Sequence, residues 1–457
     1  MYDYKINKNM TIHLPKEARH PIILELLKNY TTGVEWKACF DAKENTILIG
    51  NIDPVSADGE DYALSVTDSG AFVAGSTYGG LMRGFVTLLE RIVCNDFESY
   101  IIEGGLEKKS PKIKFRSIHF CVFPETKLTF LRKETRLAIM GKYSHIIIEF
   151  WGTLKMDSFS LLGWDDAYTK SEIKEIMDEI KAFGIEIVPF FQHWGHAALS
   201  RGGAGAGGKH VVLNQDIRYE YLYKPHTGGW VWDFKKPQVL ELLKDVRNEL
   251  IELCGEGQYF HLGCDEAEKH ISIDEALAVV NHINTVAEDL KEKGRRAIIW
   301  GDMLLSKSFF VENSKYECNA SLEIANAMLD RLSRDVIIAD WQYNINNEKW
   351  ESSKLFKEKG FDVICCPFDG RLSTSKAVET AFEWEMLGFM KTTWHTLHSS
   401  NMAQIIQSGW GSYDGVIDPN YHVFSPLISR VTGILCKIRP QIDNYTEYGW
   451  KEKQIEI

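Results

Sequence analysis

The stretch SEIKEIMDEIKAFGIEIVPFF (residues 171–191) decides the fold, because a helix is followed there by a buried strand. Its first half repeats apolar residues at helical spacing and closes at Gly184, a residue that favours the end of a helix. Its second half, EIVPFF, is a short run of apolar residues. A similar run, HIIIEF (145–150), stands before the helix. The pattern therefore predicts a strand–helix–strand unit.

Eight strand candidates of this kind lie beyond residue 110, and most of the gaps between them can hold a helix. Short, continuously apolar strands suit a parallel sheet that is buried on both faces. Eight units over about 320 residues favour a (β/α)8 TIM barrel over an open doubly wound sheet. The candidates are FRSIHFCVF (115–123), HIIIEF (145–150), EIVPFF (186–191), YFHLG (259–263), AIIWG (297–301), VIIAD (336–340), DVICC (362–366) and GFMKTTW (388–394).

Residues 1–110 read as a separate small α+β domain. ILIG (47–50) is a strand, and the segment from Asp61 gives two strands around a turn, then an amphipathic helix that ends near Ile92. The polar, proline-containing EKKSPK (107–112) is typical of a domain boundary. We therefore expect a barrel domain over residues 111–457, with a helical extension at its C-terminal end.

Composition limits the function classes. The 457 residues include 44% hydrophobic and 25% charged side chains, which is ordinary for a soluble globular protein. A net charge of −12 argues against a nucleic-acid partner. The start MYDYKINKNM lacks the apolar core of a secretory signal, and no apolar run approaches the roughly 20 residues that span a bilayer. Nine cysteines without a CxxC pair fit reduced thiols. We expect a cytoplasmic protein that does not bind a membrane.

A barrel enzyme carries its active-site residues at the C-terminal ends of its strands. Polar and aromatic side chains gather at these ends in the predicted barrel, which is a stronger signal than any single motif. They are Glu149, Gln192, Asp265, Glu266, Trp300, Asp302, Asp340, Trp341 and Trp394.

The adjacent carboxylates of Asp265 and Glu266 stand in YFHLGCDEAEKH (259–270). Acidic pairs are common at helix N-termini, where they complement the dipole and cap free amides. This pair directly follows an apolar run and a glycine at the predicted mouth of the barrel, which favours function. The strand is ending there and Gly263 permits a turn, so strand alternation need not separate the two side chains.

Metal and phosphate sites are weaker alternatives. Glu266 and His270 stand at i and i+4, and His193 and His196 at i and i+3, but neither pair matches an HExxH site with a third ligand. The glycine-rich GGAGAGGKH (202–210) satisfies GxxxxGK, yet His210 stands where a P-loop needs Ser or Thr. We expect no metal and no cofactor, and interpret the glycine-rich stretch as a loop over the barrel mouth.

Three of the thirteen tryptophans, Trp300, Trp341 and Trp394, lie at predicted strand ends. Aromatic rings stack on the apolar faces of sugars, so a carbohydrate pocket is favoured over simple core packing. A serine hydrolase finds little support because no GxSxG elbow is present.

These motifs resemble glycoside hydrolase family 20, the β-N-acetylhexosaminidases. FHLGCDEAE (260–268) is similar to the family's His-x-Gly-x-Asp-Glu signature, and FRSIHF (115–120) to its first barrel strand. PFFQHWGHAAL (189–199) resembles the third-strand segment, with Gln192 where the common form has Asp. That glutamine, with IIWGDML (298–304) and IIEFW (147–151), is more similar to the intracellular hexosaminidase D-like branch. YALSV (62–66) and GLMRGFVTLLERI (80–92) resemble the small domain before the family's barrel.

The resemblance implies exo-acting removal of terminal β-linked GlcNAc or GalNAc by substrate-assisted retention through an oxazolinium intermediate. Glu266 would be the general acid and base, and Asp265 would orient the substrate's acetamido group. The other implied substrate contacts are Arg116, with Asp302 or Glu149, for the hydroxyls; Tyr343 for the acetamido carbonyl; Trp300, Trp341 and Trp394 around the N-acetyl group; and His196 near the acid.

Two alternatives stay open. One is a non-catalytic amino-sugar-binding protein that keeps the pocket. The other is a glycosidase for a sulfated or phosphorylated hexosamine, with Lys209 and His210 facing the anion. The expected partner is a carbohydrate with a terminal N-acetylhexosamine. Barrel glycosidases are often dimers, so a homodimer is a candidate state that the sequence does not decide.

Overall fold

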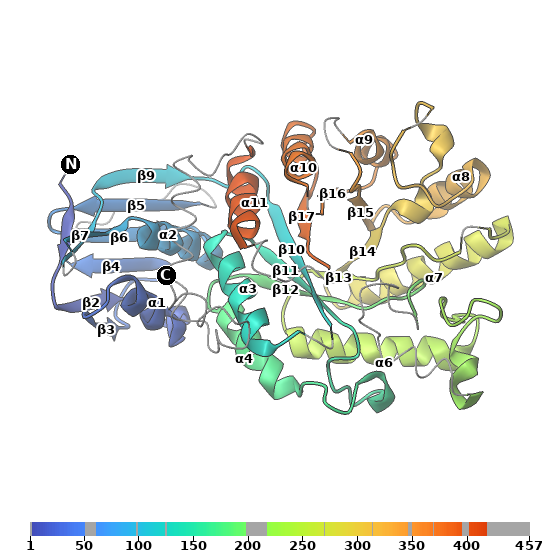
Figure 1. Ribbon diagram of the computed structural model, residues 1–457, viewed down its shortest axis with the longest axis horizontal. Helices are drawn as coiled ribbons and strands as arrows, with labels where there is room; N and C mark the ends of the chain where they lie inside the picture. The colour runs from blue at the N-terminus through green and yellow to red at the C-terminus, as the bar shows by residue number, and fades with distance from the viewer. Residues whose placement is uncertain are drawn as a thin grey trace, which may run out of the picture.

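A closed barrel of eight parallel strands forms the larger part of the molecule (Figure 1). The computed structural model describes residues 2–50, 61–96, 99–123, 126–197, 217–268, 270–312, 314–345, 350–368, 370–394 and 402–417. The strands pair in chain order, and the last one pairs with the first. This confirms the predicted (β/α)8 TIM barrel and all eight predicted strands. They are β10 (Phe115–Val122), β11 (His145–Phe150), β12 (Glu186–Phe190), β13 (Tyr259–His261), β14 (Arg296–Trp300), β15 (Ile337–Trp341), β16 (Val363–Cys366) and β17 (Gly388–Thr392).

The strands read as continuous apolar runs because both of their faces are buried. All eight residues of β10 are buried. Phe115 and Cys121 belong to the cluster inside the barrel, whereas Ile118, Phe120 and Val122 belong to the larger core between the barrel and its helices. A strand with two buried faces loses the apolar–polar alternation of a half-exposed strand.

Helices surround the barrel, and local capping signals fix where several of them begin. Helix α4 starts after Thr169, whose side chain forms a reciprocal capping box with Glu172. Within the described residues, no helix is long and apolar enough to cross a membrane. The helices are α3 (Leu128–Met140), α4 (Lys170–Lys181), α6 (Pro237–Cys254), α7 (Ile273–Glu292), α8 (Leu322–Arg331), α9 (Glu351–Glu358), α10 (Arg371–Glu383) and α11 (Met402–Asp414).

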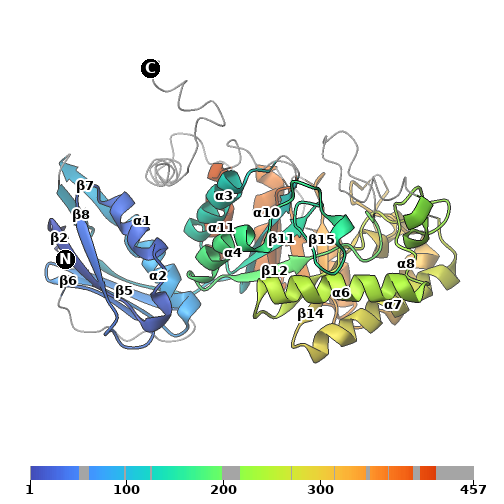
Figure 2. The same ribbon diagram turned by 90° about the horizontal axis from the view of Figure 1, so that it is seen from below.

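The N-terminal domain contains a six-stranded sheet in the order β3-β2-β4-β6-β5-β9, a three-stranded sheet in the order β1-β8-β7, and two helices. Figures 1 and 2 show this domain at one end of the barrel. Its elements are β1 (Tyr4–Ile6), β2 (Asn9–His13), α1 (Ile22–Tyr30), β3 (Glu35–Cys39), β4 (Thr46–Gly50), β5 (Tyr62–Thr67), β6 (Gly70–Gly75), α2 (Tyr78–Glu90), β7 (Ile92–Asp96), β8 (Ser99–Ile102) and β9 (Gly105–Lys109).

The N-terminal domain contacts the end of the barrel at which the strands begin. Arg83 of α2 donates hydrogen bonds to the carbonyls of Phe183 and Gly184, just before β12. The C-terminal strand ends, where barrel active sites lie, therefore face away from this domain.

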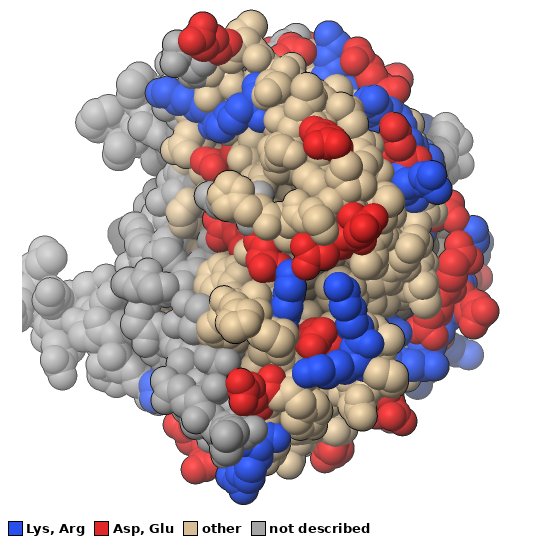
Figure 3. Space-filling view, turned by 90° about the vertical axis from the view of Figure 1, so that its right-hand side faces the viewer, with Lys and Arg blue, Asp and Glu red and all other residues tan. Residues whose placement is uncertain are grey.

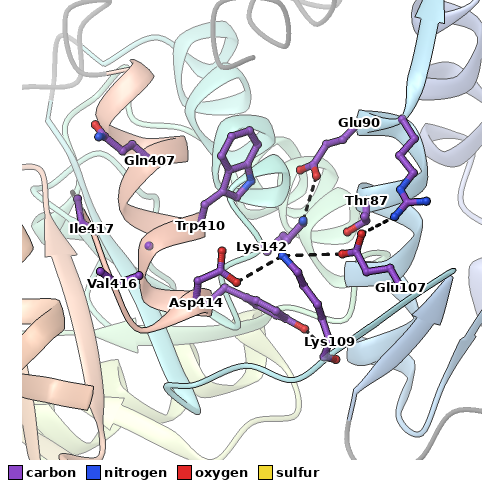
Figure 4. A pocket seen from close by; sticks show the side chains of 13 residues that line it. Thr87, Glu90, Glu107, Lys109, Lys142, Gln407, Trp410, Asp414, Val416 and Ile417 are labelled. Atoms are coloured by element: carbon purple, nitrogen blue, oxygen red, sulfur yellow. Dashed lines mark hydrogen bonds and ion pairs between the residues drawn. The ribbon is translucent and has the colours of Figure 1, made fainter. Parts of the chain in front are cut away.

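A cavity of about 290 Å³ lies at this domain junction (Figure 4). Ion pairs cross it: Lys142 Nζ lies 3.0 Å from Glu90 Oε2, and Lys109 Nζ lies 3.5 Å from Asp414 Oδ1. Because these cations are matched by carboxylates of the other domain or of α11, the cavity walls hold the two domains together.

The carboxyl of Glu134 on α3 provides a test of stability against pH. It is 0% exposed, and its Oε1 lies 3.6 Å from the Nζ of Lys133, a side chain that is itself 2% exposed. Burial raises the pKa of Glu134 from 4.5 to about 7, against the opposing effect of Lys133. Between these two values the folded state holds a proton that the unfolded state has lost, so the free energy of unfolding falls as pH rises.

We expect Glu134→Gln to remove this loss. Relative to wild type, the unfolding free energy of the variant should be on the order of 1–3 kcal/mol more favourable at about pH 7.5 than at about pH 4.5, whatever the constant cost of leaving Lys133 without its carboxylate. Urea unfolding at the two pH values measures both, and Glu175→Gln, on an exposed side chain of α4, is the control. An equal gain at both pH values would contradict the account.

Candidate active site

The backbone after β13 turns sharply and brings two neighbouring carboxylates to one place. Gly263, Cys264 and Glu266 have φ values of +67°, +74° and +44°, in the left-handed region. His196, which follows β12, also has a positive φ of 54°. Strain of this kind in non-glycine residues gathers at functional sites. The turn explains how Asp265 and Glu266 serve one site although they are adjacent in the chain.

An imidazole bridges the two carboxylates. His196 Nε2 lies 3.3 Å from Asp265 Oδ2 and 3.3 Å from Glu266 Oε2. The side chain of Asp265 is 1% exposed, whereas that of Glu266 is 35% exposed. A buried, fixed carboxylate suits an orienting role, and a partly exposed carboxylate suits proton exchange with a leaving group and water.

Gln192 fixes Asp265 from the neighbouring strand. Its side-chain Nε2 donates to Asp265 Oδ1 at 3.1 Å, and its Oε1 accepts from the backbone N–H of Cys264 at 3.1 Å. An amide can donate and accept at once, whereas an ionised Asp could only accept and would repel Asp265. The glutamine at this position is therefore a positioning residue for Asp265.

Gly263 gives a testable consequence of this packing. A Cβ at this position would lie 1.9 Å from Gln192 Oε1, and φ is +67°. Gly263→Ala should push Gln192 off Asp265 and lower activity at least about tenfold, with a loss of a few kcal/mol in stability. Gly294→Ala is the matched control, because Gly294 has φ +72° with no atom within 4 Å of its Cβ position. Hydrolysis rates and thermal unfolding of both variants measure the difference, and equal effects would refute the steric explanation.

Asp302 holds the backbone of the carboxylate pair in place at Glu266. It accepts hydrogen bonds from Glu266 N at 3.0 Å, Asn319 Nδ2 at 2.7 Å and Trp341 Nε1 at 3.0 Å. Burial, and then the charge of Asp265, raises the pKa of Asp302 to about 7. Both of its oxygens already bond protein donors, which supports a positioning role; the predicted contact with sugar hydroxyls stays a prediction.

The predicted aromatic residues form a connected wall. The rings of Trp300 and Trp394 lie 5.7 Å apart, and those of Trp341 and Tyr343 lie 4.9 Å apart. Trp394 Nε1 donates to the Tyr343 hydroxyl at 2.7 Å, which joins the two pairs. Trp300, Trp341 and Trp394 are buried, at 1%, 7% and 4% exposure. The structure therefore brings Tyr343 together with all three predicted tryptophans.

Trp230 is a site residue that the sequence reasoning missed. Its Nε1 donates to the backbone carbonyl of Glu266, and its ring lies 4.4 Å from that of His196. It stands between β12 and α6, away from any strand end, so a search of strand ends passes over it. The only local signal was an aromatic pair, Trp230 and Trp232, in this connection.

The structure contradicts the predicted contact of Arg116 with the sugar. Arg116 is the second residue of β10, so it lies at the end of the barrel where the strands begin, opposite their C-terminal ends. Its guanidinium donates to the carbonyls of Ile113, Lys114 and Lys142. Phe115 points into the barrel, so alternation turns Arg116 outward. The side chain therefore anchors the backbone at the base of the barrel.

The remaining candidates fall into different environments. Glu149 is 3% exposed on β11 and lies 3.3 Å from His119 Nε2 inside the barrel. His193 bonds Phe191 O and Arg247, separate from His196, which agrees with the sequence-based judgement that this i, i+3 pair is not a metal site. The glycine-rich stretch, with Lys209 and His210, lies outside the described residues.

Groups able to hold a metal ion occur among the described residues. His196, Asp265 and Glu266 each offer an atom within 4.8 Å of the others, and so do His119, Cys121 and Glu149. The first group coincides with the carboxylate pair, where proton transfer is the simpler use of an imidazole between two acids.

Figure 3 views the molecule from the end opposite the N-terminal domain. The barrel strands run toward this end, because the N-terminal domain contacts the end at which they begin. Acidic side chains gather near the middle of this face, beside a group of Lys and Arg. Among the described residues on this face, the Lys and Arg side chains form no broad basic surface that would suit a polyanion.

Comparison with known proteins gives a consistent result. The sequence profile described as "Glycosyl hydrolase family 20, catalytic domain" matches residues 152–400. An inactive variant of the exo β-N-acetylglucosaminidase of Vibrio harveyi superposes with a TM-score of 0.68 at 13% identity, over 96% of this chain and 75% of the other. The β-N-acetylhexosaminidase of Bacteroides fragilis gives 0.63 at 17%, over 97% and 93%. That of Streptomyces coelicolor gives 0.66 at 15%, over 96% and 93%. At such identities the structural matches show the shared fold.

Proposed function

Since the chain belongs to glycosyl hydrolase family 20, and is a glycoside hydrolase with the β-hexosaminidase fold, we propose that it removes terminal β-linked GlcNAc or GalNAc by substrate-assisted retention. The observation that carries the proposal is the pair of Asp265 and Glu266 on one imidazole, one buried and one partly exposed. Two carboxylates in such different environments suit two different tasks.

In the first step the substrate's own acetamido oxygen attacks the anomeric carbon. Asp265, held by Gln192, accepts a hydrogen bond from the acetamido N–H and offsets the positive charge that develops on the amide. Glu266 donates its proton to the glycosidic oxygen as that bond breaks. Holding the internal nucleophile close to the anomeric carbon contributes up to about 7–11 kcal/mol in favourable cases.

In the second step Glu266 takes a proton from water, which opens the oxazolinium ring at the anomeric carbon. Its partial exposure allows the water to reach it. In this proposal the wall of Trp300, Trp341 and Trp394 supports the N-acetyl group, and the Tyr343 hydroxyl, which accepts from Trp394 Nε1, donates to the acetamido carbonyl. The anomeric carbon is inverted twice, so the configuration is retained.

A panel of nitrophenyl glycosides tests this function. The β-linked GlcNAc and GalNAc derivatives should be hydrolysed, whereas the β-glucoside, which lacks the acetamido nucleophile, should react at least about 10²-fold more slowly. Equal hydrolysis of the β-glucoside would refute substrate assistance. Binding of N-acetylglucosamine without turnover of any glycoside would instead favour a non-catalytic sugar-binding protein.

A further inference from the structure

Three side chains of different chemistry meet inside the barrel on β10 and β11. His119 and Cys121 stand two residues apart and so point to the same side of the sheet, and Glu149 is the cross-strand neighbour of Cys121. Their exposures are 0%, 0% and 3%. The ring of His119 lies 4.8 Å from that of Trp394, which places the cluster beside the aromatic wall.

The three ligand atoms form a compact triangle. Glu149 Oε2 lies 3.3 Å from His119 Nε2 and 3.1 Å from Cys121 Sγ, and Sγ lies 3.5 Å from Nε2. Nitrogen, oxygen and sulfur ligands at tetrahedral Zn²⁺ stand roughly 3.3–3.6 Å from one another. The triangle thus approaches one face of such a tetrahedron. Shifts of the ligand atoms by a few tenths of an ångström would bring it to the full ligand–ligand spacing.

Charge favours a divalent cation at this place. A thiolate and a carboxylate together carry two negative charges, which a divalent ion cancels, so the buried cluster stays neutral overall. Thiolate and imidazole select zinc-like ions, whereas Ca²⁺ and Mg²⁺ prefer oxygen ligands. We propose that His119, Cys121 and Glu149 form a binding site for a thiophilic divalent cation of the Zn²⁺ and Co²⁺ class. Binding releases the thiol proton of Cys121 to solvent.

The surroundings of His119 set the strength of the site. Its Nδ1 is buried and has no hydrogen-bond partner among the described atoms. A metal on Nε2 places the ring proton on Nδ1, and loss of an outer partner typically weakens a metal site about 10–100-fold. The affinity for the ion is therefore lower than that of a permanent structural site, and the ion binds reversibly.

A second cluster of the same chemistry provides the matched control. His13, Cys39 and Asp41 also bring three ligand atoms within 4.8 Å of one another, on the N-terminal domain. The side chains of His13 and Asp41 are 31% and 63% exposed, so they are less constrained before an ion binds. Removal of each thiol in turn distinguishes the two clusters.

The test is a Co²⁺ titration of the metal-free full chain, followed by the near-ultraviolet band that arises from thiolate bound to cobalt. We expect wild type and Cys39→Ser to show the band, which should saturate at about one Co²⁺ per chain. Zn²⁺ should displace the Co²⁺ and abolish the band. Cys121→Ser should lose the band. No band in wild type, a band that persists in Cys121→Ser, or a band that disappears in Cys39→Ser would each overturn the proposal.

Circular dichroism establishes whether Cys121→Ser is folded, and a second variant decides the matter if it is not. Glu149→Gln keeps the thiol and should weaken Co²⁺ binding at least about tenfold while the band remains at saturation. Unchanged affinity in Glu149→Gln would also overturn the proposal. These readouts do not use glycoside hydrolysis, so they stand apart from the outcome of the glycoside panel.

Discussion

Glu266→Gln should lower the hydrolysis of an aryl N-acetyl-β-glucosaminide by about 10²–10⁴-fold, the usual contribution of a general acid and base. The amide has nearly the size of the carboxylate but no acidic proton, so the leaving oxygen departs without protonation. Steady-state kinetics with leaving groups of different basicity measure the effect. The loss should be greatest for poor leaving groups and smallest for dinitrophenolate, which needs little protonation.

The control is Glu268→Gln, two residues further on, whose carboxylate pairs with Lys224 and not with His196. Near-normal activity of Glu266→Gln towards poor leaving groups would remove Glu266 from the role of acid. A similar loss in Glu268→Gln would show that the effect arises from disturbance of this loop.

Asp265→Asn should lower kcat for acetamido substrates by roughly 10²–10³-fold, comparable to the loss of one preorganised electrostatic contact. The Asn side chain can no longer offset the positive charge that develops as the acetamido oxygen attacks. The fold should persist, since Asn keeps the shape that meets Gln192. A thiazoline mimic of the oxazolinium intermediate should inhibit wild type, and it should bind Asp265→Asn more weakly by a similar factor.

Two readouts distinguish this role from a structural one. The variant should lose affinity for the thiazoline more than for N-acetylglucosamine itself, because only the former resembles the charged intermediate. The pKa of Asp302 should also fall, since the charge of Asp265 contributes to raising it. Equal losses of affinity for both ligands would indicate that Asp265 only shapes the pocket.

Local sequence determined the barrel because the residue types within each strand reflect the burial of that strand. Burial on both faces excludes polar residues from a strand, so HIIIEF and its counterparts are visible without knowledge of their partners. The carboxylate pair was visible for the same reason: it interrupts the apolar pattern where the strand ends. The aromatic wall followed from the rule that barrel sites lie at the C-terminal strand ends, which places Trp300, Trp341 and Trp394 on one side.

Arg116 shows where this reasoning stops. The motif placed it on the first barrel strand, which is correct, but it did not say which face of β10 the side chain occupies. Only closure of the barrel makes Phe115 the inward residue and turns Arg116 to the outside. A shift of one residue reverses every side chain of a strand, so the direction depends on pairing with β11 and β17.

The sequence by itself therefore determined the eight-stranded barrel and the adjacent carboxylates, since both depend on patterns within a few residues. Only the tertiary structure decided how those carboxylates are held. Gln192 reaches Asp265 across 73 residues of chain, and Asp302 holds the backbone of Glu266 across 36. Contacts of this kind depend on strand register around the closed barrel, because the register sets which strand ends become neighbours.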